Sequence, residues 1–222
     1  MRLAVLCSGG KDSLYAAFLA KKMGHEIAAL VSMQSSNLDS FLFHTPSIEK
    51  VRVQADAMQV PLVIGNTIGI KEEEIFDLSF CLHEAKQKFG VQGVVTGAVE
   101  SAYQAARFQR ACLELDLEMF NPLWQMDQVL LIESLIRDGF KAIVVGVAAY
   151  PLDESWLGRC IDVKFLSEVC ELESKYGINP AGEGGEFESF VLNCPLFRRP
   201  LEVVDEKKSG SKNAWRLEVN VV

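Results

Sequence analysis

Six consecutive residues near the start of the chain have the types needed to bind a phosphate: Ser8-Gly9-Gly10-Lys11-Asp12-Ser13. Glycines let the backbone approach a phosphate closely, hydroxyls donate hydrogen bonds, and a lysine supplies a mobile positive charge. Asp12 would repel a phosphate unless a cation lay between them, so we expect it to bind a phosphate-held Mg²⁺. The expected chemistry is the binding of a phosphate, with Mg²⁺ beside it.

The sequence does not match the motifs of two common phosphate-binding loops. A P-loop needs G-x-x-x-x-G-K-[ST], but Val5 stands where its first glycine should be and Asp12 stands where its Ser or Thr should be. The dinucleotide fingerprint G-x-G-x-x-G also fails, because Lys11 and Asp12 follow the two glycines directly. If the loop binds a phosphate, it does so with neither of these two motifs.

A second stretch whose residues could take part in chemistry is acidic and rich in glycine, and it runs from Gly182 to Ser189. It carries Glu183, Gly184, Gly185, Glu186 and Glu188. If 187–192 is a strand, Glu186 and Glu188 face the same side. Three carboxylates in one pocket would raise one another's pKa unless a cation is present, so the motif predicts a positively charged ligand. An acidic surface turn is the alternative.

A third group lies on a helix predicted over 101–115, with Ser101 as its N-cap. Gln104, Arg107 and Arg110 are spaced three apart and share a helical face, and Tyr103 lies beside them. Arg107 could bind a phosphate or a carboxylate with two hydrogen bonds. The alternative is a solvated basic stripe.

The elements that position these residues alternate in the first half of the chain. Apolar runs at 2–7, 25–33, 61–65 and 91–97 predict strands, and periodic segments at 14–23, 47–58, 71–89 and 101–115 predict helices. This alternation predicts a parallel sheet covered by helices on both faces, with ligands beyond the carboxyl ends of the strands. That edge holds the Ser8–Ser13 loop, Ser32, Met33 and His44 after the second strand, and Gly97 after the fourth.

The alternation of predicted strands and helices ends after Trp124. Helices are expected at 127–138 and 163–176, a strand at 141–147, and a hairpin from 201–204 and 215–221 joined by a turn over 207–213. We therefore expect an α/β domain over 1–124 and a smaller α+β domain over 125–222. Trp124 is a boundary chosen by topology, because no low-complexity linker marks it.

The composition of the chain argues against some classes of function. The chain has 222 residues and a net charge of −8, which disfavours binding to bulk nucleic acid. No apolar run approaches the length of a membrane span, and the six cysteines form no C-x-x-C pair. We expect a cytoplasmic protein with free thiols, and Cys7 as a packing residue. The oligomeric state stays open, with a homodimer as one option.

The string Ser8-Gly-Gly-Lys-Asp-Ser13, directly after an amino-terminal strand, resembles the loop of the PP-loop (N-type) ATP pyrophosphatases. That resemblance implies a Rossmann-like, HUP-type nucleotide-binding domain that cleaves ATP between the α- and β-phosphates. The residues at the predicted ligand edge, namely the loop, Ser32, Met33, His44 and Gly97, are then expected to contact ATP, with Lys11 and Asp12 as catalytic residues.

Two further segments sharpen the resemblance. The run from Gly97 through Tyr103, Gln104 and Arg107 to Cys112, followed by Leu123-Trp124, is similar to a segment of the diphthine–ammonia ligases. Glu183-Gly-Gly-Glu-Phe-Glu-Ser189 with Cys194-Pro195 looks like their substrate-recognition motif. Gln109 departs from the first of these family segments and Asn193 departs from the second, since an acidic residue is expected at each position.

The resemblance implies an ATP-dependent amide ligase. It would adenylate the carboxylate of diphthine on elongation factor two, with ammonium as nitrogen donor and Mg²⁺ on the phosphates. Tyr103, Gln104, Arg107 and the Glu183–Glu188 motif would bind the acceptor, with Phe187 or Tyr103 as an aromatic face for its quaternary ammonium. Glu100, Glu183 and Glu186 are candidate bases. The alternatives are a PP-loop enzyme acting on a tRNA base or a small carboxylate, and a non-catalytic nucleotide-binding module.

Overall fold

The computed structural model describes residues 1–35, 48–70 and 73–222 of the chain. These residues form two compact units, Met1–Trp124 and Gln125–Val222.

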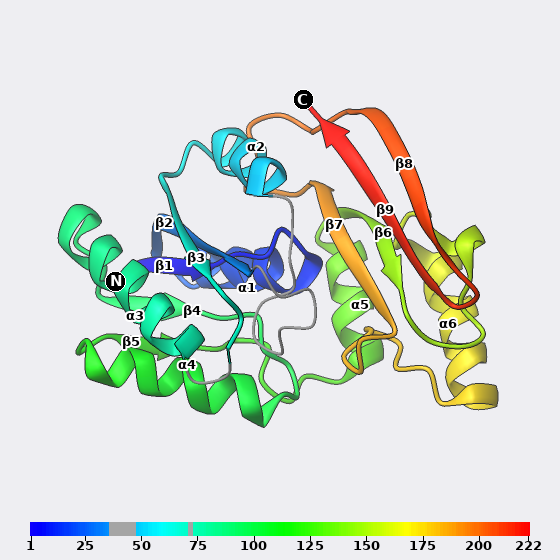
Figure 1. The fold of residues 1–222 in the computed structure, drawn as a ribbon, viewed down its shortest axis with the longest axis horizontal. Helices are drawn as coiled ribbons and strands as arrows, with labels where there is room; N and C mark the ends of the chain where they lie inside the picture. The colour runs from blue at the N-terminus through cyan, green and yellow to red at the C-terminus, as the bar shows by residue number, and fades with distance from the viewer. Residues whose placement is uncertain (36–47, 71–72) are drawn as a thin grey trace. The chain divides into compact units, whose positions relative to one another are not determined.

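The first unit alternates strands and helices in the order that the apolar patterns predict. Its strands are β1 (Arg2–Leu6), β2 (Glu26–Ser35), β3 (Leu62–Thr67), β4 (Gly93–Val95) and β5 (Glu118–Phe120). Its helices are α1 (Lys11–Lys22), α2 (Ile48–Met58), α3 (Glu73–Phe89) and α4 (Ala102–Glu114). The strands form one sheet in the order β3-β2-β1-β4-β5, with every neighbouring pair parallel (Figure 1). The predicted parallel, Rossmann-like sheet is therefore confirmed.

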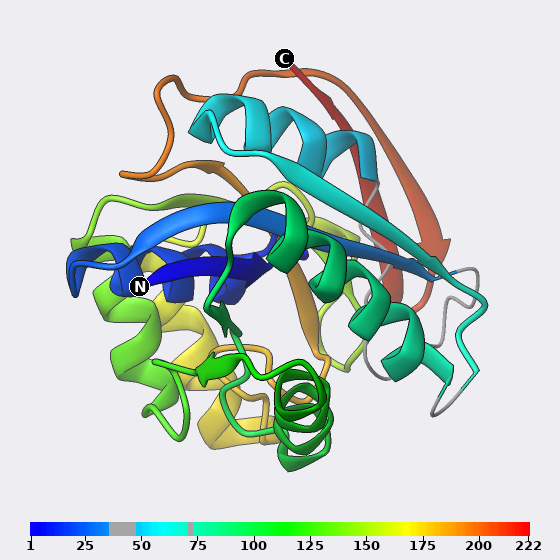
Figure 2. The same cartoon turned by 90° about the vertical axis from the view of Figure 1, so that its left-hand side faces the viewer.

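The strand order reverses direction once, between β1 and β4. The chain first moves outward from β1 to β2 and β3, and then returns to the other side of β1 to form β4 and β5. Because such crossovers are right-handed, α1 and α2 cover one face of the sheet while α3 and α4 cover the other (Figure 2). The point of reversal is where ligands bind in open sheets of this kind.

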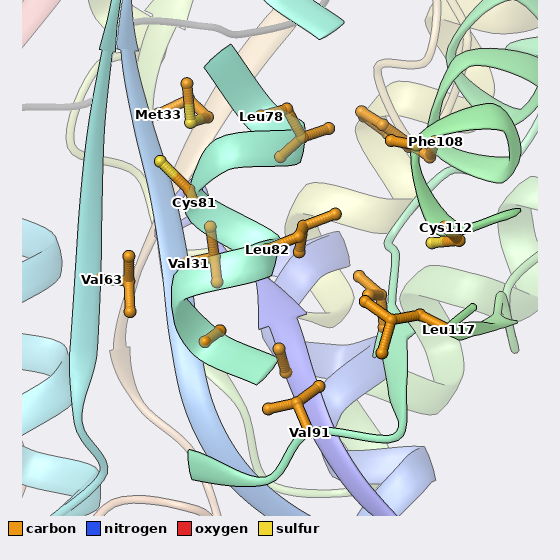
Figure 3. Packing of buried hydrophobic residues seen from close by; sticks show 14 of the residues in the cluster. Val31, Met33, Val63, Leu78, Cys81, Leu82, Val91, Phe108, Cys112 and Leu117 are labelled. Carbon is orange, nitrogen blue, oxygen red and sulfur yellow. The ribbon is translucent and has the colours of Figure 1, made fainter. Parts of the chain in front are cut away.

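Apolar side chains between the sheet and α3 and α4 form one core cluster of this unit. Figure 3 shows Leu78, Cys81 and Leu82 of α3 packed between side chains of the sheet and side chains of α4. The sheet contributes Val31, Met33 and Val63, and α4 contributes Phe108 and Cys112. This continuous core fixes the strands whose carboxyl ends carry the predicted nucleotide site.

The second unit is a four-stranded antiparallel sheet with two helices. Its strands are β6 (Lys141–Val147), β7 (Phe187–Asn193), β8 (Val203–Ser211) and β9 (Ala214–Val221), in the order β7-β6-β9-β8. Its helices are α5 (Gln128–Arg137) and α6 (Val163–Tyr176), with a short 3₁₀ turn over Glu154–Trp156. The buried rings of Phe165 in α6 and Phe187 in β7 meet edge to face at 5.3 Å, which anchors α6 to the sheet.

Three local expectations were wrong. Strand β5 was not expected, because only three residues pair at this sheet edge, too few to show a pattern. Helix α1 begins at Lys11 rather than near Leu14, so the polar half of the loop is its first turn. The segment expected as a turn over 207–213 is strand as far as Ser211, because its charged residues pair with β9 along an exposed edge strand.

Candidate functional site

The loop between β1 and α1 gives the helix an uncapped start. Gly10 is the N-cap residue and no side chain caps the first turn, so the amino terminus of α1 presents its partial positive charge. Gly9 has a φ of 80°, in the left-handed region that a residue with a side chain rarely adopts. A glycine is therefore required where the backbone turns from strand to helix.

Hydrogen bonds hold this loop in shape. The Ser13 hydroxyl donates to the Gly10 carbonyl at 3.1 Å, and the Ser8 and Ser13 hydroxyls lie 3.4 Å apart. Gln54 Nε2, on α2, donates to the Gly9 carbonyl at 3.0 Å from a fully buried position. Sequence reasoning missed Gln54; the available signal was a glutamine on an otherwise apolar helix face. The loop is thus fixed from a second helix as well as from its own residues.

Lys11 and Asp12 form a close ion pair at the start of α1. Lys11 Nζ lies 2.9 and 2.8 Å from the two Asp12 carboxylate oxygens, and the lysine is only 3% exposed. Asp12 keeps 27% of its side chain accessible. In this structure the charge of one residue therefore neutralises that of the other.

Magnesium was expected on Asp12. Among the described residues no group of three or more His, Cys, Asp or Glu side chains could hold a metal ion without other ligands. A single carboxylate fits Mg²⁺ that takes its remaining ligands from phosphates and water. The residues present therefore suit a metal that arrives with the nucleotide.

Gly97 brings the end of β4 against the first turn of α1. A Cβ at Gly97 would lie 2.7 Å from both the Asp12 carbonyl carbon and the Ser13 nitrogen, closer than real contacts allow. The loop and Gly97 thus meet at the point where the strand order reverses. The structure brings these predicted residues together.

Two buried hydroxyls follow the same edge of the sheet. Ser32, near the end of β2, is 1% exposed, and Thr96, directly after β4, is fully buried. Within the part of the chain that the structure describes, neither hydroxyl has a hydrogen-bond partner. Ser32 was predicted and Thr96 was not. Unpaired buried hydroxyls are costly, so their presence at this edge is consistent with a polar ligand site.

The other predicted nucleotide contacts have different surroundings. Met33 is 4% exposed and its side chain lies in the hydrophobic core, so its own part in a site is limited to its backbone. His44 lies outside the described residues. The thiol of Cys7 is buried, and this burial raises its pKa to about 11. Cys7 is therefore a packing residue, as expected, because a neutral thiol is a poor nucleophile.

Helix α4 presents a stacked pair beside its first turn. The Arg107 guanidinium lies over the Tyr103 ring at 3.5 Å from its centroid. Ser101 caps the helix as predicted, with its hydroxyl accepting from the Gln104 nitrogen at 3.3 Å. Arg110 instead pairs with Glu114 at 3.0 Å on the surface. Arg107 and Tyr103 thus act as one unit, and one face of the tyrosine ring is already occupied.

In the second unit, a glycine-rich turn leads into β7 and carries the predicted glutamates. Asn179 organises it: its side-chain Oδ1 accepts from the nitrogens of Ala181 and Glu183 at 3.0 and 3.2 Å. Its backbone nitrogen donates to Glu186 Oε1 at 3.1 Å. Sequence reasoning missed Asn179, although an asparagine before a proline is a turn signal.

The strand expected after this turn is present, and Glu188 is half-buried in it. Its side chain lies over Gly146 of β6, where a Cβ would come within 3.3 Å of Oε2. Phe187 was expected as an aromatic face for a cationic ligand, and this was wrong. The ring is 6% exposed and packs against Phe165 in the core, so it cannot contact a ligand.

Comparisons with known proteins agree over most of the chain. A family model described as diphthamide synthase N-terminal domain matches residues 1–119, and one described as diphthamide synthase C-terminal domain matches residues 127–220. Diphthine–ammonia ligase of Mus musculus is 36% identical over 233 residues, covering 96% of this chain and 86% of the mouse protein. The Homo sapiens protein of that name is 34% identical, covering 94% of this chain and 84% of its own length.

More distant proteins were also found. Diphthine–ammonia ligase of Schizosaccharomyces pombe is 29% identical over 93% of this chain but only 37% of its own length. A solved structure titled as a predicted subunit of tRNA methyltransferase from Methanocaldococcus jannaschii aligns over 85% of this chain and 95% of that one, with 15% identity and a TM-score of 0.41. That score is too low to bear on fold or function.

No helix among the described residues is long and apolar enough to cross a membrane. Both parts of the chain match models of diphthamide synthase, and the mouse and human relatives align over most of this chain and most of their own length. The chain therefore belongs to the diphthine–ammonia ligase family, whose models are named diphthamide synthase.

Proposed function

We propose that the chain is an ATP-dependent ligase that converts the carboxylate of diphthine on elongation factor two into an amide, giving diphthamide with release of AMP and pyrophosphate. The observation that carries the proposal is the uncapped start of α1 at the point of strand reversal, backed by Gly97, in a chain whose two parts both match diphthamide synthase models. The domain roles follow: 1–124 binds ATP and 125–222 recognises the acceptor.

In the first step, the loop holds the β- and γ-phosphates of ATP. Backbone N–H groups at the start of α1 and the hydroxyls of Ser8 and Ser13 would bind phosphate oxygens, with Lys11 stabilising charge on the departing pyrophosphate. Asp12 would hold Mg²⁺ against the same phosphates. Ser32, Met33, His44 and Gly97 would surround the nucleoside. The substrate carboxylate then attacks the α-phosphorus, the bond to pyrophosphate breaks, and an acyl-adenylate forms.

In the second step, ammonia attacks the carbonyl carbon and AMP leaves. Tyr103, Gln104 and Arg107 would orient the acceptor, because the fixed guanidinium of Arg107 suits a carboxylate or a phosphate. Glu183, Glu186 and Glu188, with Gly184 and Gly185, are the residues of 125–222 that we propose to bind the acceptor. Carboxylates attract a quaternary ammonium without needing a hydrogen bond from it. The reaction would take place in the cytoplasm, with ammonium as donor; a homodimer is an option that the scheme does not require.

The test is an analysis of products with purified chain, ATP, Mg²⁺ and ammonium. AMP and pyrophosphate forming only when elongation factor two carrying diphthine is present would support the proposal. ADP as the nucleotide product would exclude adenylation. Turnover with bulk tRNA or with a small carboxylate would favour the alternative ligases, and tight ATP binding without turnover would favour a binding module.

A further inference from the structure

A buried side chain on α2 holds the carbonyl group of Gly9 in the Ser8–Ser13 loop. Gln54 Nε2 donates a hydrogen bond to this carbonyl at 3.0 Å. Gln54 is fully buried, so solvent does not compete for the bond. The direction of the Gly9 carbonyl is therefore set by a residue 45 positions away in the sequence.

The direction of this carbonyl also sets the direction of the next N–H group. The Gly9 carbonyl and the Gly10 N–H belong to one planar trans peptide, in which the two groups point in opposite directions. Because the carbonyl points toward buried Gln54, the Gly10 N–H points toward the exposed side of the loop. There it approaches the hydroxyl of exposed Ser8 at 3.4 Å, a long hydrogen bond that a phosphate oxygen could replace.

The two glycines leave this peptide free to turn over. A half turn would carry φ of Gly10 from −82° into the positive region, which a glycine tolerates and other residues rarely adopt. The turned peptide would present the Gly9 carbonyl oxygen, an acceptor, to the place that a negatively charged phosphate needs. Without a further contact, the loop could thus adopt a form that repels its ligand.

We propose that Gln54 is a positioning residue for the ATP phosphates, which keeps the Gly10 N–H turned toward them by binding the Gly9 carbonyl. This inference rests on the proposed function, because it takes the Ser8–Ser13 loop as the site of the β- and γ-phosphates. It adds a residue that touches no substrate. A donor that is already oriented does not have to be turned when the ligand binds, so Gln54 strengthens the binding of the phosphates and not of the nucleoside.

The experiment compares Gln54→Met with the unaltered chain by calorimetric titration. Methionine is close to glutamine in length and in helix propensity, but it has no N–H donor. We expect the affinity for inorganic pyrophosphate and for ATP to fall about tenfold, the scale of one hydrogen bond to a charged group. The affinity for AMP, which lacks the β- and γ-phosphates, should stay unchanged.

A second variant on α2 controls for a loss of stability. Ala55→Gly removes a buried methyl group from the residue next to Gln54 and weakens the helix. It leaves the glutamine donor in place, so we expect a lower free energy of unfolding in urea with an unchanged affinity for pyrophosphate. If Ala55→Gly weakened pyrophosphate binding as much as Gln54→Met, α2 would act through stability alone and the positioning role would be wrong.

The remaining outcomes separate the positioning role from the proposed function. Equal pyrophosphate affinity in Gln54→Met and in the unaltered chain, or an equal loss for AMP and pyrophosphate, would overturn the role of Gln54 and leave the ligase in place. An unaltered chain that binds neither ATP nor pyrophosphate would instead contradict the nucleotide site itself.

Should Gln54→Met not fold, the amide of Gly10 in the unaltered chain decides. Its NMR signal should shift when pyrophosphate is added, because the N–H donates to the ligand. A signal that stays in place while pyrophosphate binds would show that this N–H faces elsewhere and that Gln54 does not orient it for the phosphates.

Discussion

Lys11 and Asp12 form a close ion pair at the start of α1, to which we assign the chemistry of the phosphates. In the structure each neutralises the other, with the lysine almost fully enclosed. If this pair opens to receive the phosphates and Mg²⁺, both charges are needed at the same step. We predict that Lys11→Ala and Asp12→Ala each slow pyrophosphate release by about 10²–10³-fold, as for other groups that stabilise transition-state charge.

The measurement is pyrophosphate release under saturating ATP. Lys21→Ala is the control, because Lys21 lies exposed at the other end of α1 and should leave the rate unchanged. A normal rate in Lys11→Ala would contradict the assigned role of this lysine.

Gly97 gives a second prediction at the scale of single residues. A methyl group there meets the backbone of Asp12 and Ser13, which cannot move as a flexible side chain could. We expect Gly97→Ala to lower the free energy of unfolding by about 1–3 kcal/mol and to weaken ATP binding, measured by urea unfolding and by calorimetric titration. Gly177→Ala, strained at the end of α6 by a φ of 72° but meeting no atom, should reduce stability alone. If Gly97→Ala and Gly177→Ala bound ATP equally well, Gly97 would not be part of the nucleotide site.

The residues of the loop could be predicted because their types are adjacent in sequence and each has a direct chemical use. Gln54, Thr96 and Asn179 could not. Gln54 contacts the loop across 45 positions of sequence, and the Asn179 side chain accepts hydrogen bonds from backbone nitrogens of its own turn. Phe187 was misassigned because an aromatic residue beside glutamates suits either a ligand or a core, and only packing decides between them.

At the scale of elements, helix α4 depends on its cap for the placement of Tyr103 and Arg107. The Ser101 hydroxyl accepts from the Gln104 nitrogen in the first turn of that helix. We predict that Ser101→Ala lowers the free energy of unfolding by about 1 kcal/mol and raises KM for the protein acceptor more than KM for ATP. Ser101→Asp retains a capping oxygen and should restore both. Failure of that rescue would show that the hydroxyl contacts a ligand instead of capping the helix.

Element types were predictable where apolar periodicity extended over several turns or a full strand. The βα alternation of the first unit and helices α5 and α6 follow their patterns closely. The errors arose where pairing decides structure: β5 has three residues, and β8 is a strand because β9 supplies its hydrogen bonds despite its turn-like composition. Local sequence cannot record a partner that is distant along the chain.

At the scale of the whole molecule, buried thiols link stability to alkaline pH. Burial raises the pKa of Cys112 from 9.0 to about 12, and burial, with the nearby charges of Glu84 and Asp77, raises that of Cys81 to about 11. Above pH 9 the unfolded chain loses these protons while the folded chain keeps them, so the free energy of unfolding falls as pH rises. It should fall by up to about 1.4 kcal/mol per pH unit for each thiol.

Urea unfolding at pH values between 8 and 11 measures this decline. Cys112→Ala is less stable overall because it leaves a small cavity, yet its stability should depend less steeply on pH. An unchanged slope would mean that the Cys112 thiol ionises as easily in the folded chain as in the unfolded one.

The central claim is that this chain joins nitrogen to the carboxylate of diphthine through an adenylate. The most direct measurement is mass spectrometry of elongation factor two carrying diphthine after incubation with the chain, ATP and nitrogen-15-labelled ammonium, with AMP quantified in parallel. We predict one labelled amide nitrogen on the modified histidine for each AMP released. Unlabelled factor, or labelled factor accompanied by ADP instead of AMP, would contradict the account.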